Sequence, residues 1–206
     1  MPPDALPERF DERRELLLAD VIAGQRVLDL GCGDGRFSAA MVGAGVSVVG
    51  VDAAAEALRR AREHAPEAEF VQVDEGAPLP FADASFDLVW CGETLEHVVD
   101  VALLLGEVRR VLVAGGMLLA TTPNHARLVV AYEALAGGPL ERRLDPRSDH
   151  LRFFTARTLR DLLSGAGFDQ VSVIAVDGPP LLRRSLVARA RLSVSSSSYS
   201  SSRRRV

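Results

Sequence analysis

Apolar and polar positions along the chain follow two alternating patterns. Short runs in which nearly every residue is apolar are separated by stretches in which apolar residues recur at roughly helical spacing. The first pattern is typical of strands buried on both faces, and the second of amphipathic helices. The predicted strands are VLDL, VSVVGVD, EFVQVD, FDLVWC and MLLATTP, and the predicted helices are FSAAMVGAG, AEALRRAREHA and Val101 to Val113. This alternation predicts a parallel sheet with helices on both faces.

Further elements flank the alternating unit. A first helix is predicted from about Glu8 to Ala23, because Phe10, Leu17 and Ile22 fall at roughly helical spacing. An insert at about 124–152, rich in proline, glycine and charge, is predicted to be a loop or short helices that act as a substrate lid. The chain then continues with a helix, TARTLRDLLSGAGF, a strand, VSVIAV, and a last strand, SLVARARL, which is expected to pair antiparallel with it.

The length and composition fit one domain. A chain of 206 residues with 48% hydrophobic content can bury a single sizeable core. We expect that domain to span residues 1–194, because neither a linker nor an internal repeat separates two comparable units. The low-complexity end, SSSSYSSSRRRV at 195–206, has almost nothing to bury and is predicted to be disordered.

The charge balance and the cysteines indicate which kinds of partner the protein binds and in which cellular compartment it is expected. The 28 acidic residues exceed the 24 basic ones, which argues against nucleic acid as a substrate. Cys32 and Cys91 lie beside predicted strand ends instead of forming a spaced disulfide framework. The first residues carry acids and prolines where a signal peptide has a basic flank and an apolar stretch. We therefore expect a cytoplasmic protein.

No stable membrane insertion is expected either. No apolar run reaches the roughly 18 residues that a spanning helix requires. The run PPLLRRSLVARARL has the composition of a basic membrane-surface segment, but its arginines do not share one helical face, which favours a closing strand of the sheet.

The stretch VLDLGCGDGRFS places a glycine-rich turn between a predicted strand and a predicted helix. In such a turn, backbone N–H groups and the positive end of the helix can approach a polar ligand. Asp52 follows about 20 residues later, at the end of the second strand, where an acidic side chain can bind the two hydroxyls of a ribose. The pattern therefore indicates a nucleoside cofactor. A dinucleotide is less well matched, because Arg36 occupies the position where that fingerprint requires a small residue.

The ordered blocks VLDLGCGDGRFS, VVGVD, VQVDEGAPLPFADASFDLVWC, ETLEHVVD, VRRVLVAGGMLLATTPN and HLRFFTARTLRDLLSGAGF cover about Arg26 to Val176. In this order they resemble the class I S-adenosylmethionine-dependent methyltransferases, particularly the small-molecule and ubiquinone-biosynthesis subgroup. The resemblance implies an α/β fold with a Rossmann-like, doubly wound, seven-stranded and mostly parallel sheet whose last strand is antiparallel. It also implies S-adenosylmethionine as cofactor and S-adenosylhomocysteine as product.

The resemblance assigns residues to each part of the cofactor. Asp29, Gly31 and Gly33 would surround the amino acid end, and Cys32 between the glycines would contribute its backbone and otherwise pack. Cys91 would lie under the methionine portion. The remaining predicted cofactor-binding residues are Asp52 and Ala53 at the ribose, and Asp74, Glu75 and Gly76 at the adenine.

The segment ExxEH, formed by Glu93, Glu96 and His97, is expected where the helix after the fourth strand begins. Positions three and four apart share one helical face, so these side chains can converge. Some quinone-pathway relatives bind a divalent ion at a similar segment. We favour another interpretation, in which Glu96 helps the helix to start, Glu93 and His97 face the substrate side, and no metal is bound.

The acceptor side rests on two histidines. His125 and His150 flank the insert at carboxyl ends of strands, where ligands lie in open α/β sheets, and are the candidate general bases. We predict methyl transfer to a small-molecule acceptor, with an oxygen nucleophile as the first choice on resemblance alone. The alternatives are an NAD(P)-dependent reductase and a non-catalytic protein that binds the cofactor as a scaffold.

Overall fold

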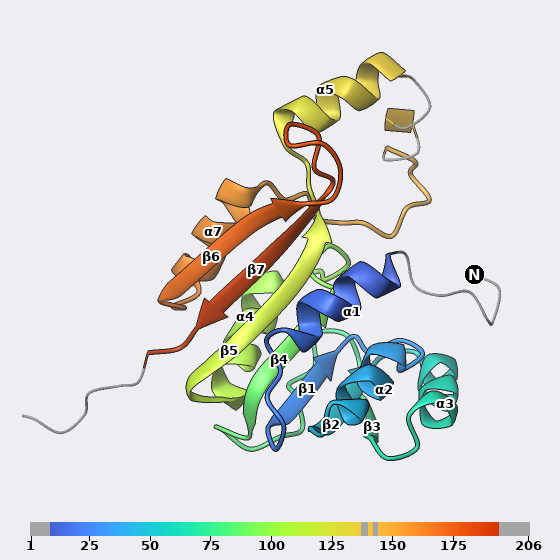
Figure 1. Cartoon of the computed structure of the whole chain (residues 1–206), viewed down its shortest axis with the longest axis vertical. Helices are drawn as coiled ribbons and strands as arrows, with labels where there is room; N and C mark the ends of the chain where they lie inside the picture. Colours follow the sequence, from blue (N-terminus) through green and yellow to red (C-terminus); the bar gives the residue numbers. More distant parts are fainter. Residues whose placement is uncertain (1–8, 137–139, 142–143, 194–206) are drawn as a thin grey trace, which may run out of the picture.

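Seven strands form one sheet in the order β3-β2-β1-β4-β5-β7-β6 (Figure 1). This computed structural model describes residues 9–136, 140–141 and 144–193. The strands are β1 (Arg26–Leu30), β2 (Ser47–Asp52), β3 (Glu69–Gln72), β4 (Phe86–Gly92), β5 (Leu112–Pro123), β6 (Gln170–Val176) and β7 (Ser185–Arg191). Neighbours from β3 to β5 pair in parallel, whereas β7 is antiparallel to both β5 and β6. The predicted doubly wound, mostly parallel sheet is confirmed.

Helices cover both faces of the sheet (Figure 1). They are α1 (Phe10–Leu18), α2 (Arg36–Gly43), α3 (Ala55–His64), α4 (Val101–Val111), α5 (Arg127–Ala136) and α7 (Ala156–Gly165). Val27 packs with α1 and α2 in one apolar cluster, whereas the next residue, Leu28, packs with α4 and α7 in another. This difference follows from the strand geometry, in which successive side chains point to opposite faces. Trp90 and Phe86 are buried core residues.

Two element boundaries differ from the sequence prediction. The first helix ends at Leu18 instead of about Ala23, and Asp20 beyond it forms a 2.7 Å ion pair with Arg189 of β7. Ile22, counted in the apolar stripe, is 66% exposed. Strand β5 begins at Leu112, directly after α4, because the backbone becomes extended there and Leu112 pairs with Phe86. The predicted helix to Val113 is therefore two residues too long.

The insert after β5 contains helix α5, which lies beyond the carboxyl end of β5 in Figure 1. An isolated bridge between Asn124 and Phe154 closes the insert at its base. Helix α7 then starts at Thr155, whose side chain forms a capping box with Thr158. Of the two predicted forms of the insert, a loop or short helices, the described residues include a helix, and the predicted helix TARTLRDLLSGAGF is confirmed as α7.

Within the described residues, no helix combines the length and the apolar character needed to cross a membrane. The run SLVARAR forms β7 in the interior of the sheet between β5 and β6. The predicted disorder of residues 195–206 lies outside the described residues.

The order of the strands locates the ligand-binding edge. The chain runs outward from β1 through β2 to β3 and then returns to β4 on the other side of β1. In open parallel sheets, ligands bind at such a reversal, outside the carboxyl ends of the strands. The loops after β1, β2, β3 and β4 all leave from that edge.

Candidate functional site

A cavity of about 230 Å³ lies at this edge of the sheet. It is bounded by the turns after β1 and β2, the segment after β3, the turn after β4, and one side of α4. Among the predicted site residues, those that line it are Gly31, Asp52, Ala53, Asp74, Glu75, Gly76 and His97. The sheet thus gathers side chains from four separate sequence blocks around one space.

Gly31 allows the turn after β1 to pass close to the turn after β4. Its φ angle is +74°, and a Cβ atom at this position would lie 2.5 Å from Oγ1 of Thr94. The Thr94 hydroxyl donates to the carbonyl of Leu30 at 3.1 Å, which fixes the two turns together. Any larger residue at position 31 would force them apart.

The carboxylate of Asp52 ties two turns together at the end of β2. Its Oδ2 atom accepts the backbone N–H of Gly33 at 2.9 Å, and its Oδ1 atom accepts that of Ala54 at 2.9 Å. The N-cap residue of α3 is Ala54, so Asp52 is not itself the helix cap. An ionised carboxylate offers about four lone-pair sites, so acceptor capacity remains for a ligand in the cavity.

The segment after β3 forms another wall of the cavity. Asp74, Glu75 and Gly76 are exposed, and a turn is closed by the N–H of Ala77 donating to the carbonyl of Asp74 at 3.0 Å. One carboxylate oxygen of Glu75 accepts the N–H of Val99 at 3.2 Å, which links this segment to the loop before α4.

Asp29, Cys32 and Cys91 are buried and do not line the cavity. Asp29 accepts a 2.6 Å hydrogen bond from the hydroxyl of Ser38, yet burial raises its pKa to about 7. Burial likewise raises the pKa of both thiols well above the ordinary range. Both cysteines are therefore protonated packing residues at neutral pH instead of reactive thiolates.

The ExxEH segment is a turn and not the start of a helix, which corrects the prediction. Glu93 has a φ angle of +53°, and the N–H of His97 donates to the carbonyl of Thr94 at 3.0 Å. Helix α4 starts later, with Asp100 as N-cap accepting the N–H of Leu103 at 2.9 Å. Glu96 therefore does not help the helix to start.

Glu96 instead connects the turn to the insert and to β5. Its backbone carbonyl accepts the N–H groups of Leu151 and Arg152, and its buried carboxyl group accepts the hydroxyl of Thr122 at 3.0 Å. Burial, followed by the nearby charge of Glu93, raises the pKa of Glu96 to about 8. The raised pKa favours the protonated form of this carboxyl group.

The two candidate histidines of the insert have different surroundings. His150 packs edge-on against His97, with ring centroids 4.8 Å apart, so it lies beside a residue that lines the cavity. His125 packs edge-on against Phe153 at 5.0 Å and is not among the cavity-lining residues. The structure thus brings His150 and His97 together and places His125 elsewhere.

One cluster of these residues has the spacing of metal ligands. Glu96, His97 and His150 each offer a donor atom, and these atoms all lie within 4.8 Å of one another. The metal-binding alternative considered from the sequence comprised Glu93, Glu96 and His97. In the structure, His150 takes the place of Glu93 in this cluster.

Arg13 of α1 is a candidate cofactor-binding residue that was not predicted from the sequence. Its guanidinium lies 4.8 Å from the ring centroid of Phe37, and a Cβ atom on Gly92 at the end of β4 would be 2.7 Å from its Nη2 atom. Its charge also lowers the pKa of Asp29, against the larger effect of burial. The signal in the sequence was a charged residue on the helix face that carries Phe10 and Leu17.

Comparisons with known proteins identify the family of the chain. The methyltransferase domain family matches residues 28–120. A ubiquinone biosynthesis O-methyltransferase from Psychrobacter arcticus is 30% identical over 175 residues, covering 82% of this chain and 68% of that protein. A protein of the same name from Azorhizobium caulinodans is 34% identical over 167 residues, covering 78% and 65%.

Solved structures give the same result. A SAM-dependent methyltransferase from Methanosarcina mazei has a TM-score of 0.67 at 25% identity, covering 87% of this chain and 97% of its own. One from Mesorhizobium loti shares the fold, with a TM-score of 0.70 at 23% identity over 90% and 98%. The predicted cofactor, S-adenosylmethionine, is confirmed, and the reductase alternative is not favoured. The chain belongs to the class I S-adenosylmethionine-dependent methyltransferases.

Proposed function

We propose that this methyltransferase transfers the methyl group to an oxygen nucleophile of a small molecule, and that the cavity at the carboxyl ends of β1 to β4 holds the donor. The observation that carries the donor site is the position of Asp52, which lies at the end of β2, lines the cavity and is bonded to the glycine turn. The oxygen acceptor is supported by the relatives, which are named O-methyltransferases.

The nucleoside part of the donor would lie between polar and apolar walls. Asp52, with Ala53 beside it, would bind the ribose hydroxyls. Asp74 would accept the adenine amino group, with Glu75 and Gly76 next to it. Leu79 and Leu103 give the apolar contacts that a purine ring needs, because both line the same cavity.

The amino acid part would lie towards β4 and α1. Gly31 and Gly33 would supply backbone groups there, with Cys32 and Cys91 packing behind them and the buried carboxyl group of Asp29 beside them. We assign Arg13 to the carboxylate of the methionine portion, because guanidinium and carboxylate pair well and Arg13 lies beside Gly92.

The charge of the cavity favours this donor over a dinucleotide. Asp52, Asp74, Glu75, Asp100 and Glu107 line it, and no arginine does so within the described residues. Such a lining attracts a sulfonium cation and repels a pyrophosphate. The acidic lining therefore argues against a dinucleotide. Arg36 argues against it too, because it occupies the position where the dinucleotide fingerprint requires a small residue.

Transfer itself is in-line displacement at the sulfonium methyl, so positioning and exclusion of water are the main tasks. We assign the insert at 124–152 as the lid over the acceptor, within one domain at residues 1–194. His150 or His125 would take the proton of the acceptor hydroxyl, with Glu93 and His97 on the substrate side and no metal required. Nucleic acid is not the acceptor in this proposal.

Release of S-adenosylhomocysteine tests the proposal. Purified protein is incubated with S-adenosylmethionine and a panel of phenols, catechols, amines and carbon acids, and product is quantified by mass spectrometry. We expect turnover with a hydroxyl acceptor and only background release with the others. Turnover with amines alone would overturn the oxygen assignment, and tight donor binding without any turnover would favour the scaffold alternative.

A further inference from the structure

The segment between β3 and β4 carries part of the cavity wall without secondary structure of its own. Val73 to Ala77 and Leu79 line the cavity, and Leu79 is only 5% exposed. Leu79 lies between Pro78 and Pro80, which have no N–H group to donate. Such a stretch cannot join the sheet as a regular strand, so other parts of the molecule must fix its conformation.

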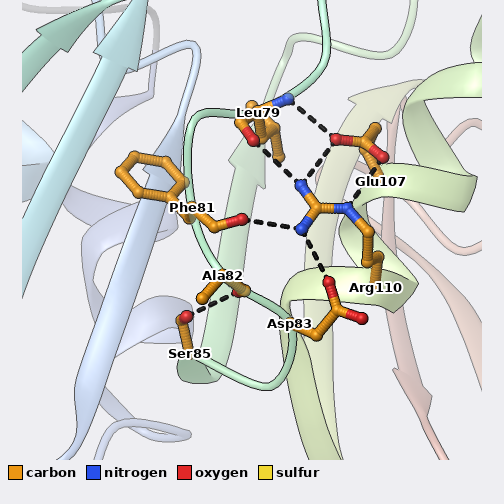
Figure 2. A network of polar contacts seen from close by, with 7 residues as sticks. All are labelled: Leu79, Phe81, Ala82, Asp83, Ser85, Glu107 and Arg110. Atoms are coloured by element: carbon orange, nitrogen blue, oxygen red, sulfur yellow. Dashed lines mark hydrogen bonds and ion pairs between the residues drawn. The ribbon is translucent and has the colours of Figure 1, made fainter.

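Arg110, in the last turn of α4, uses all five of its N–H donors, three of them on this segment and two on Glu107 of the same helix (Figure 2). Its Nη2 atom donates to the carbonyl of Leu79 at 2.9 Å, and its Nη1 atom donates to the carbonyl of Phe81 at 2.6 Å. The same Nη1 atom bonds the carboxylate of Asp83 at 2.9 Å. The remaining donors, on Nε and Nη2, go to the two carboxylate oxygens of Glu107 at 2.9 and 2.8 Å.

Glu107 completes the connection from the other side of Leu79. Its Oε2 atom accepts the N–H of Leu79 at 2.8 Å, so both backbone polar groups of Leu79 are bound by one ion pair of α4. Glu107 lines the cavity, as do Leu103 and Leu104 on the same helix. This ion pair therefore joins two walls of the cavity, namely the segment after β3 and the side of α4 that lines the cavity.

The backbone of Arg110 adds another contact to the same segment. Its carbonyl accepts the N–H of Ala84 at 2.9 Å, and Ala84 has a φ angle of +52°. A non-glycine residue keeps this conformation only where its surroundings enforce it. The segment is thus fixed to α4 at Leu79, Phe81, Asp83 and Ala84.

We propose that Arg110 is a positioning residue for donor binding: its ion pair with Glu107 fixes Leu79 and so preforms the nucleoside side of the cavity. The inference rests on the proposed donor site. A loose segment would lose conformational entropy when the donor binds, whereas a preformed wall is already ordered. Fixing the segment should therefore increase the affinity for the donor. Arg110 itself does not line the cavity, and its effect therefore acts through Leu79 and Glu107.

Arg110→Lys tests this role, because lysine keeps the charge but cannot form the planar fork. The matched control is Arg59→Lys, since Arg59 also bonds two glutamates, Glu56 and Glu63, but lies on the exposed surface of α3. Affinities for S-adenosylhomocysteine and for methylthioadenosine, which lacks the amino acid end, are measured by calorimetry on the folded proteins. We expect Arg110→Lys to weaken both ligands by about tenfold or more, and Arg59→Lys to change neither.

Kinetics and hydrogen exchange separate positioning from general stability. In Arg110→Lys the KM for S-adenosylmethionine should rise by about the same factor while kcat at saturating donor changes less than about twofold. Amide exchange should accelerate within residues 77–85 and slow again on ligand binding. Asp83→Ala removes a single outer contact and should leave affinity within about twofold. If Arg110→Lys does not fold, Glu107→Gln takes its place with the same expected direction.

An unchanged affinity in folded Arg110→Lys would overturn the inference, as would an equal loss in Asp83→Ala or Arg59→Lys. A fall in kcat without a change in affinity would also overturn it. Failure of the donor-site proposal has a different signature, because Asp52→Ala would then leave S-adenosylhomocysteine binding intact in the otherwise wild-type protein.

Discussion

The side chain of Asp52, at the end of β2, accepts a hydrogen bond of 2.9 Å from the backbone N–H of Gly33 in the turn after β1. Two elements that are 19 residues apart in the chain are therefore joined before any ligand binds. The acidic residue and the glycine turn form one preassembled unit, so a substitution at Asp52 affects both.

Asp52→Ala is expected to weaken S-adenosylhomocysteine binding by roughly 1.5–3 kcal/mol, because the ribose hydroxyls lose a charged acceptor. Asp52→Asn keeps one acceptor oxygen for the turn and should lose less. Calorimetry on the folded variants measures both effects. Asp74→Ala is the comparison, since Asp74 is exposed and contacts one amino group in our proposal, and its loss should be smaller. Equal affinity in Asp52→Ala and wild type would refute the ribose assignment.

His150→Ala should lower turnover by roughly 10²–10⁴-fold while donor affinity barely changes, if His150 is the base. We expect the smaller effect from His125→Ala, because His150 lies against cavity-lining His97 and His125 does not line the cavity. With a phenol acceptor, the loss should shrink at high pH, where the acceptor is already deprotonated. Near-normal rates in both variants across pH would mean that neither histidine is the base.

The buried carboxyl group of Glu96 predicts a pH-dependent stability. Its pKa is raised from 4.5 to about 8, so the folded state holds the proton more tightly than the unfolded chain does. This contribution to stability is complete below about pH 4.5 and is lost as the pH rises through about 8. Glu96→Gln cannot ionise, so its unfolding free energy should fall less over this range, by up to roughly 1.4 kcal/mol per pH unit. Urea unfolding at several pH values tests this, and parallel pH profiles would contradict it.

Removal of metal ions should leave turnover unchanged. The donor atoms of Glu96, His97 and His150 lie within 4.8 Å, but the Glu96 carboxyl group is buried and already accepts the hydroxyl of Thr122. In-line displacement at a sulfonium methyl can proceed by positioning alone, without a Lewis acid. Dialysis against EDTA followed by an activity assay checks this. Activity that disappears and returns with added Mg²⁺ or Zn²⁺ would show that the cluster binds metal.

Much of the fold was predictable because its signals are local. The apolar runs identified β1 to β5, and the threonine before α7 identified a helix start that the Thr155 and Thr158 capping box confirms. The predicted end of α1 was wrong: the helix stops at Leu18, and Asp20 beyond it pairs with Arg189, which is 169 positions away in the chain. Local spacing contains no information on such a contact.

The candidate site was predictable only where the chain supplies a motif. The glycine turn and the acidic residues after β2 and β3 line one cavity, as their positions at strand ends imply. The ExxEH segment was misread as helical, because its spacing fits a helix while the backbone of Glu93 is fixed by the carbonyl of Thr121 on β5. Arg13 and Arg110 were missed for a related reason, since their contacts depend on how helices pack against distant loops.

The most direct test of the account uses S-adenosylmethionine carrying a carbon-13 methyl group with the hydroxyl acceptor that gives turnover. We predict that the label appears in a methyl ether of the acceptor, in equal amount to the S-adenosylhomocysteine formed, and that Asp52→Ala forms it only at higher donor concentration. Label found on nitrogen or carbon of the acceptor, or the same donor dependence in Asp52→Ala as in wild type, would contradict the account.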